Sequence, residues 1–181
     1  EINNIKVLNS IKLFVIKNLP DDLFDRERGN YLNLDTLFLL KYYGYGQLLN
    51  NKFLVFEFIN GHDLYDIKDL KLTNADKFSI IYELISSFIF IHAKNYIYRD
   101  LKPNNIMIDK KNTAILIDLD RMIKGPVCSC ESTQFMHSFY APEIESNSFT
   151  NSCDIYSLGL IIYYLMTEKE PNSQDSSKIL M

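Results

Sequence analysis

The chain has 181 residues, of which 47% are hydrophobic, 13% aromatic and 23% charged, and its formal net charge at pH 7 is −4. This composition is typical of about one globular domain, and it excludes collagen-like, mucin-like and highly charged disordered sequence. The acidic balance gives no general attraction for nucleic acid, and no apolar run approaches the ~18 residues that a membrane span needs.

Strand and helix patterns alternate in the N-terminal part of the chain. β-Branched residues with partial alternation predict strands within residues 5–19, which Pro20 ends. A helix is expected over residues 21–34, because two aspartates suit its first turn. Residues 37–44 and 52–58 are strand-like, and together they predict a hairpin in which Gly44 and Gly46 are turn signals.

Helices dominate the remainder. Residues 73–76 resemble a helix N-cap, and apolar residues follow at helical spacing as far as Ile91. Two short strands are expected at 105–108 and 114–117, and a second apolar helix is expected over residues 153–167. Because strands come first and helices later, we expect an α+β chain in two lobes.

Four motifs in a fixed order give the strongest functional signal. They are Tyr98-Arg-Asp-Leu-Lys-Pro-Asn-Asn105, Asp118-Leu-Asp120, Ala141-Pro-Glu143 and Asp154-Ile-Tyr-Ser-Leu-Gly159. In these motifs the chain resembles a eukaryotic protein kinase, and the pairing of Lys102 with Pro103 is similar to the serine/threonine branch.

The resemblance implies a two-lobed, kinase-like α+β fold. Residues 1–58 would form a partial small lobe of antiparallel strands plus one helix, without the Gly-rich loop. Residues 59–63 would be the hinge, and residues 64–181 a partial, mainly helical large lobe. We therefore expect a kinase domain truncated at both ends, poorly stable and inactive as an isolated fragment.

The same resemblance implies an ATP- and Mg²⁺-dependent phosphotransferase. Phosphoryl transfer needs little covalent help, because positioning and charge neutralisation lower most of its barrier. Asn105 and Asp118 would supply the hard oxygen ligands that Mg²⁺ prefers. Asp100 would accept the proton of the substrate hydroxyl, and Lys102 would neutralise charge on the transferring phosphate.

Earlier segments match the nucleotide site of the kinase pattern. Val15-Ile-Lys17 resembles the small-lobe strand whose lysine contacts the α and β phosphates. An ungapped alignment places Glu27 as the carboxylate partner of Lys17, and Asp25 is the competing register. The hinge-like segment and the strand after Asn105 complete the expected site, with Phe56 as gatekeeper, backbone groups of Glu57 and Ile59 at adenine, Asp63 at the ribose and Met107 under the ring.

Some residues depart from the kinase pattern. No Gly-rich phosphate loop precedes Lys17, and Asp120 replaces a glycine. Two carboxylates about 4 Å apart repel, so we expect Asp120 to point away from Asp118. Met136 or His137 falls where a serine or threonine usually helps to position the substrate.

Three functions compete on these observations. The retained motifs favour a serine/threonine protein kinase whose partners are ATP and a protein substrate. The departures favour a pseudokinase acting as a binding or scaffold module. A small-molecule phosphotransferase is the third candidate, against which the long activation segment argues. The sequence does not indicate an oligomeric state.

The three cysteines are too few for a disulfide scaffold, which suggests a reducing compartment, and we expect the cytoplasm. Cys128 and Cys130 lie near His137, but their spacing matches no common structural zinc site.

Overall fold

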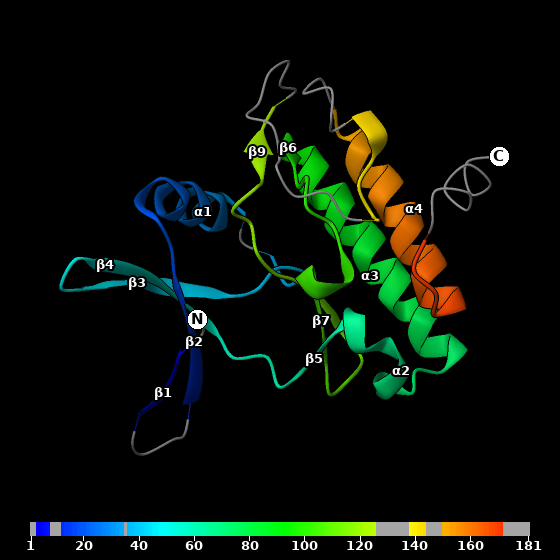
Figure 1. Cartoon of the computed structure of the whole chain (residues 1–181), viewed down its shortest axis with the longest axis horizontal. Helices are drawn as coiled ribbons and strands as arrows, with labels where there is room; N and C mark the ends of the chain where they lie inside the picture. The colour runs from blue at the N-terminus through cyan, green and yellow to red at the C-terminus, as the bar shows by residue number, and fades with distance from the viewer. Residues whose placement is uncertain (1–2, 8–11, 35, 126–137, 144–149, 172–181) are drawn as a thin grey trace.

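The computed structural model describes residues 3–7, 12–34, 36–125, 138–143 and 150–171 (Figure 1). Four antiparallel strands form the first sheet in the order β1-β2-β4-β3. These strands are β1 (Asn3–Val7), β2 (Lys12–Asn18), β3 (Tyr42–Leu48) and β4 (Asn51–Glu57). On the central strands β2 and β4, Val15 lies opposite Phe56 and Lys17 opposite Leu54. Lys17 is thereby held on a strand that is paired on both sides.

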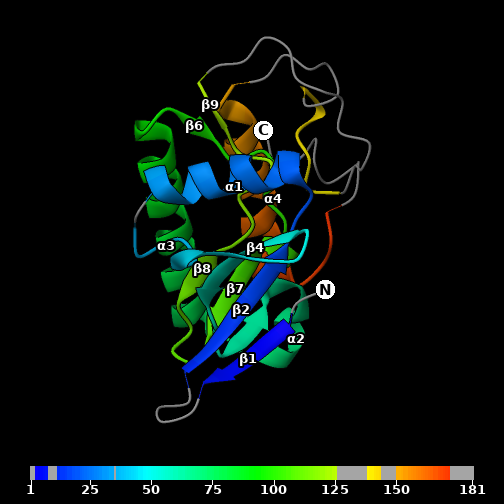
Figure 2. The same ribbon diagram turned by 90° about the vertical axis from the view of Figure 1, so that its left-hand side faces the viewer.

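Helix α1 (Asp21–Asn33) lies next to this sheet in Figures 1 and 2 and confirms the helix predicted over residues 21–34. Its buried aromatic residues Phe24 and Tyr31 face the strands. The ring of Tyr31 lies 4.7 Å from that of Phe56, and Phe24 meets Tyr45 edge-on at 5.9 Å. Aromatic packing therefore fixes α1 against β3 and β4.

The predicted hairpin is present, but its first strand begins five residues later than residue 37, at Tyr42. The residues before it pair elsewhere, because the backbone NH of Leu40 donates to the carbonyl of Leu116 at 2.9 Å. Leu39 is buried at this junction. The apolar pattern that indicated a longer strand instead reflects a link between the first sheet and the second.

Gly44 and Gly46 lie inside β3, so their prediction as turn residues is wrong. Gly46 faces Phe53 across the hairpin, and a Cβ on it would lie 2.4 Å from the Phe53 ring. Glycine is needed there for close cross-strand approach. The turn itself contains Leu49, which has a positive φ of 54°.

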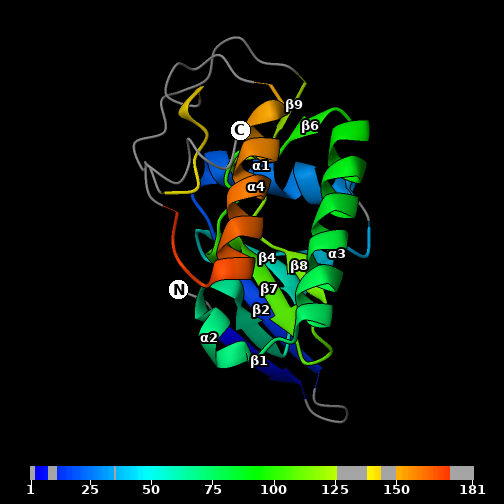
Figure 3. The same ribbon diagram turned by 90° about the vertical axis from the view of Figure 1, so that its right-hand side faces the viewer.

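The helical part is built on α3 (Asn74–Ala93) and α4 (Ser152–Thr167), which run side by side in Figure 3. Thr73 caps α3, since its hydroxyl accepts from the Asp76 NH while the Asp76 carboxylate accepts from the Thr73 NH. Both predicted helices are confirmed to within two residues. Among the described helices, none is long and apolar enough to cross a membrane.

Short elements connect these helices to the first sheet. β5 (Gly61–Asp63), β7 (Ile106–Asp109) and β8 (Ala114–Leu116) form a second sheet in the order β5-β7-β8. β6 (Tyr96–Ile97) pairs with β9 (Ile123–Lys124). Three short helical turns lie between these elements: η1 (Leu64–Asp66), α2 (Ile67–Leu70) and η2 (Pro103–Asn105).

One continuous core spans both parts of the molecule. Its fully buried side chains include Leu54 and Phe56 from the first sheet, Leu116 from the second and Ile161 from α4. The α+β expectation is confirmed, and the polar residues described next lie where the two parts meet.

Candidate active site

Asp154 of α4 anchors the loop that carries Asp100. Its Oδ2 accepts from the backbone NH of Tyr98 and its Oδ1 from that of Arg99, each at 2.8 Å. His92 Nε2 lies 2.8 Å from Oδ2, and Asp154 is only 1% exposed. The residue that precedes α4 is Asn151, and Asp154 lies in the first turn of this helix. Its contacts fix the backbone on the N-terminal side of Asp100.

Asp100 brings the predicted catalytic residues together. Its Oδ2 accepts from Lys102 Nζ at 2.8 Å and from Asn105 Nδ2 at 3.0 Å. Asn105 Nδ2 also lies 2.8 Å from the Asp100 carbonyl, which closes the loop on itself. The other carboxylate oxygen, Asp100 Oδ1, accepts from the hydroxyl of Tyr140 at 2.8 Å. Asp100 is 3% exposed, so its charge is balanced mainly by protein groups.

Tyr98 connects this loop to the Asp118 segment. Its hydroxyl donates to the carbonyl of Ile117, and its ring packs edge-on against Phe88 at 5.9 Å. Burial raises the pKa of Tyr98 well above its usual value, so the hydroxyl remains a donor. The Ile117 NH in turn donates to the Asn105 carbonyl at 3.0 Å. Asn105 and Asp118 therefore lie on adjacent segments, as a shared cation site requires.

Lys17, Glu27 and Asp118 form a second polar group, which we call the lysine cluster. Lys17 Nζ lies 2.9 Å from Glu27 Oε2 and 2.7 Å from Asp118 Oδ1. Glu27 was the partner predicted from the ungapped alignment. The competing residue Asp25 is exposed, which rules out that register.

Burial and charge oppose each other in the lysine cluster. Burial raises the pKa of Glu27 to about 7, because loss of water outweighs the attraction of Lys17. For Lys17, burial lowers the pKa, but Glu27 and Asp118 outweigh it and the pKa is raised overall. The cluster therefore holds a stable cation beside a carboxyl group that titrates near neutral pH.

Helix α1 also binds the Asp118 segment directly. Glu27 Oε1 accepts from the backbone NH of Leu119 at 3.3 Å. Asn30 Nδ2 donates to the carbonyls of Leu119 and Met122 at 2.8 and 3.0 Å. Asn30 was not identified from the sequence, although its position three residues after Glu27 places both on one helix face. Leu119 is fully buried.

The prediction that Asp120 points away from Asp118 is wrong. The carboxyl groups of Asp120 and Asp118 interact, and burial, followed by the Asp118 charge, raises the pKa of Asp120 to about 6. Lys17 partly offsets this repulsion. Asp118 itself has a positive φ of 63°, which turns the chain back so that the Asp120 NH lies 3.5 Å from Asp118 Oδ1.

The residues expected at a nucleotide come from strands of both sheets and from the segment that links them. Val15 and Phe56 are register neighbours on β2 and β4, and Met107 of β7 pairs with Asp63 of β5. Ile59 lies two residues after the end of β4. The backbone NH of Glu57 donates to the Lys41 carbonyl at 2.9 Å, so at a base Glu57 would offer its carbonyl.

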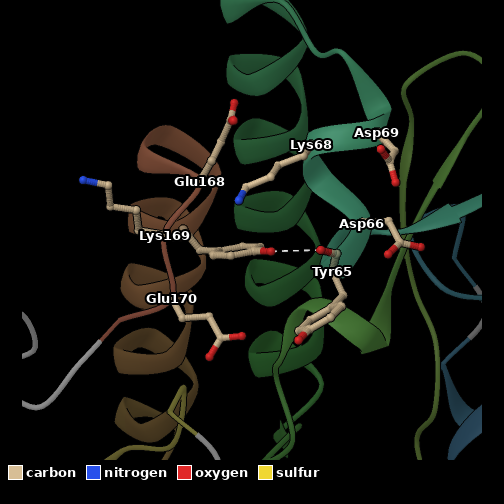
Figure 4. Close-up of a pocket in the computed structure, with 8 residues that line it drawn as sticks. Tyr65, Asp66, Lys68, Asp69, Glu168, Lys169 and Glu170 are labelled. Atoms are coloured by element: carbon tan, nitrogen blue, oxygen red, sulfur yellow. Dashed lines mark hydrogen bonds between the residues drawn. The ribbon is translucent and has the colours of Figure 1, made fainter.

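A separate pocket of about 590 Å³ lies between α2 and the end of α4 (Figure 4). Its lining mixes carboxylates with amines, and in Figure 4 Lys68 and Asp69 come from α2 and Glu168 from the end of α4. No residue of this pocket belongs to the lysine cluster or to the Asp100 loop. We place the candidate site at those two groups, because buried, mutually bonded charges need a functional explanation that a solvated surface hollow does not.

Asn105 and Asp118 fit the Mg²⁺ role by their chemistry. Both offer oxygen ligands, and the amide NH₂ group of Asn105 donates to the carbonyl and the carboxylate of Asp100. Within the described ranges, no group of three or more histidine, cysteine, aspartate or glutamate side chains could hold a metal. Mg²⁺ would therefore need phosphate oxygens and water to complete its coordination, as it usually does.

Several residues singled out in the sequence lie outside the described residues. These are Cys128, Cys130, Met136 and His137. Cys153 is described, and burial raises the pKa of its thiol well above its usual value.

The chain matches the protein kinase domain family over residues 3–181. Calcium-dependent protein kinase 4 of Plasmodium berghei (strain Anka) is 28% identical over 151 residues, which cover 76% of this chain and 28% of that protein. Maternal embryonic leucine zipper kinase of Xenopus tropicalis is 29% identical over 184 residues, or 94% of this chain and 28% of that protein.

A plant relative is similar at the same level. Serine/threonine-protein kinase RUNKEL of Arabidopsis thaliana is 29% identical over 143 residues, covering 74% of this chain and 10% of that protein. The chain thus spans less than a third of the length of each of these curated relatives.

Proposed function

The chain belongs to the protein kinase family, and from this premise we propose that it transfers the γ-phosphate of ATP to a serine or threonine hydroxyl of a protein. The observation that carries the proposal is the meeting of two groups of charges from distant segments. Lys17, Glu27 and Asp118 form one group, and the loop containing Asp100 forms the other. The serine/threonine preference is supported by Lys102 and by the relatives named above.

On the acceptor side, Asp100 is the general base. Its carboxylate, positioned by Asp154 through the loop backbone, takes the proton from the attacking hydroxyl as the new P–O bond forms. Lys102 lies beside the same carboxylate and would stabilise the negative charge of the transferring phosphate. Asn105 holds Asp100 Oδ2, which restricts rotation of the base.

On the nucleotide side, Lys17 binds the α and β phosphates, and Glu27 holds the Lys17 ammonium in place. Asn105 and Asp118 would hold Mg²⁺, which when bound supplies charge neutralisation at the phosphates. Val15, Phe56, Met107 and the backbone of Glu57 and Ile59 would enclose the adenine, and Asp63 would reach the ribose. A reducing compartment such as the cytoplasm suits the small number of cysteines.

A pseudokinase is the alternative function, and one observation favours it. The Asp120 carboxyl lies against Asp118, at the residue that would hold the cation. When ionised, Asp120 adds negative charge that attracts a cation. When protonated, it can donate to Asp118 and compete for the oxygens that the cation needs. A protein with this arrangement could bind nucleotide without turning it over.

The test, run on the full-length protein that contains this domain, is transfer of labelled phosphate from ATP in the presence of Mg²⁺ to a protein acceptor, with a small-molecule acceptor in parallel. We expect transfer to the protein acceptor, and we expect Asp100→Asn to reduce turnover by on the order of 10² or more, because the base is lost. The exposed Asp69→Asn variant is the matched control and keeps full turnover.

Bound nucleotide without transfer to any acceptor would support the pseudokinase. Transfer to the small molecule alone would support the third candidate. Turnover unchanged in Asp100→Asn would remove Asp100 from the mechanism.

A further inference from the structure

The hydroxyl of Tyr140 lies where an acceptor hydroxyl has to be. It donates to Asp100 Oδ1 at 2.8 Å, while Lys102 and Asn105 occupy Oδ2. A general base must lie about 2.6–3.2 Å from the oxygen whose proton it takes. Tyr140 meets that distance from within the chain itself.

Contacts of its side chain hold Tyr140 in this position. Tyr140 is buried, and Arg121 Nη1 donates to its hydroxyl at 3.4 Å. Burial and then the charge of Asp100 raise the pKa of Tyr140 well above its usual value, so it stays protonated and remains a donor.

The segment that carries Tyr140 can move more easily than a helix or strand of the core. Residues 138–141 have neither helical nor strand structure. The neighbouring Phe139 packs edge-on against Tyr164 of α4 at 5.7 Å, which anchors the segment one residue before Tyr140. Movement of the tyrosine therefore breaks side-chain bonds to Asp100 and Arg121 without unfolding a helix or a strand.

We propose that Tyr140 is an internal competitor for the acceptor place at Asp100 and thereby sets the apparent affinity for the protein substrate. This inference rests on the proposed kinase function. An acceptor hydroxyl binds only to molecules in which Tyr140 has left Oδ1. The apparent KM for the acceptor is then raised by the reciprocal of the fraction in which the place is open.

The experiment measures acceptor saturation curves at saturating Mg²⁺ and ATP, with dephosphorylated casein as a generic acceptor. Tyr140→Phe removes the hydroxyl and keeps the ring. We expect the KM for casein to fall about 5- to 10-fold, with kcat and the KM for ATP unchanged within twofold, because only the competing donor is lost.

Tyr164→Phe is the matched control. The Tyr164 hydroxyl donates to the Tyr65 carbonyl at 2.9 Å, drawn as the dashed line in Figure 4, in the pocket between α2 and α4. The substitution removes a phenolic donor bonded to Tyr65 rather than to Asp100, and it keeps the ring that packs on Phe139, so the KM for casein should not change.

The sign of the change in KM decides the inference. An unchanged or higher KM in an active Tyr140→Phe variant would overturn it and assign the tyrosine a structural or substrate-positioning role. Transfer by Tyr140→Phe where the wild type shows none would support it. Absence of transfer in both proteins, with nucleotide bound, would overturn the proposed kinase function and this inference with it.

Discussion

The Asp100 loop and the lysine cluster hold charges of the same kinds by different means. In the loop, Asp100, Lys102 and Asn105 contact one another within six residues of chain, and Asp154 fixes the backbone that carries them. In the lysine cluster, by contrast, Lys17 and Asp118 are 101 residues apart in sequence. The loop therefore has its geometry built in locally, whereas the lysine cluster exists only while α1 is docked on the Asp118 segment.

This difference suggests different sensitivities for the two regions. Loss of an anchor under the loop should cost global stability, since buried backbone groups lose their partners. Changes in the lysine cluster should depend on pH, since Glu27 titrates within the accessible range. The predictions below separate the two regions in order of expected effect.

The largest effect on stability is expected for Asp154→Ala. The substitution leaves the backbone NH groups of Tyr98 and Arg99 buried without the carboxylate that accepts from them. We expect the free energy of unfolding to fall by about 3 kcal/mol or more. Urea denaturation of this variant and of the exposed control Asp69→Asn measures it. A loss of less than ~1 kcal/mol would show that the loop does not depend on this anchor.

Glu27→Gln should reveal the pH dependence of the lysine cluster. The folded protein holds the Glu27 proton more tightly than the unfolded chain does, since its pKa is raised from 4.5 to about 7. The folded state therefore binds more protons within this window, and the wild type loses stability as pH rises through it. The loss, relative to a glutamine that cannot titrate, is up to about 3 kcal/mol.

The measurement is urea denaturation of wild type and Glu27→Gln at several pH values between 4.5 and 8. Asp25→Asn, on the exposed side of the same helix, is the control and should give a constant difference from the wild type. A constant difference for Glu27→Gln as well would mean that Glu27 stays ionised throughout and that Lys17 dominates its pKa.

The smallest effect is expected within α1 itself, from Gly29→Ala. Gly29 lies in the helix interior, and a Cβ on it would meet no heavy atom within 4 Å. We expect the variant to be more stable by ~0.5–1 kcal/mol, because alanine loses less backbone freedom on folding. The thermal midpoint should rise accordingly, and a decrease would show that the helix is more closely packed at this position than the structure indicates.

The local motifs allowed most of the fold and the loop to be predicted from the sequence. Asp100, Lys102 and Asn105 are close because they are neighbours in the chain, so their spacing alone nearly determines their contacts. The choice between Glu27 and Asp25 was harder. Residues two positions apart on a helix point about 200° away from each other, and only the docking of the helix decides which of the two is buried.

Other features depend on contacts that a sequence pattern does not encode. The start of β3 was predicted too early. The apolar Leu39 is buried at the junction with Leu116 and does not belong to the strand. Asp120 was misplaced because the positive φ of Asp118 reverses the chain. Tyr140 was not among the predicted site residues, since nothing in its neighbours indicated contact with Asp100.

The most direct test of the account compares nucleotide affinity in Lys17→Met and Asp100→Asn, measured by calorimetric titration with Mg²⁺ and a non-hydrolysable ATP analogue. If the lysine cluster binds nucleotide and the loop acts on the acceptor, Lys17→Met raises the Kd at least about tenfold and Asp100→Asn leaves it within about twofold. Wild-type affinity in Lys17→Met, or lost affinity in Asp100→Asn, would contradict this division of roles.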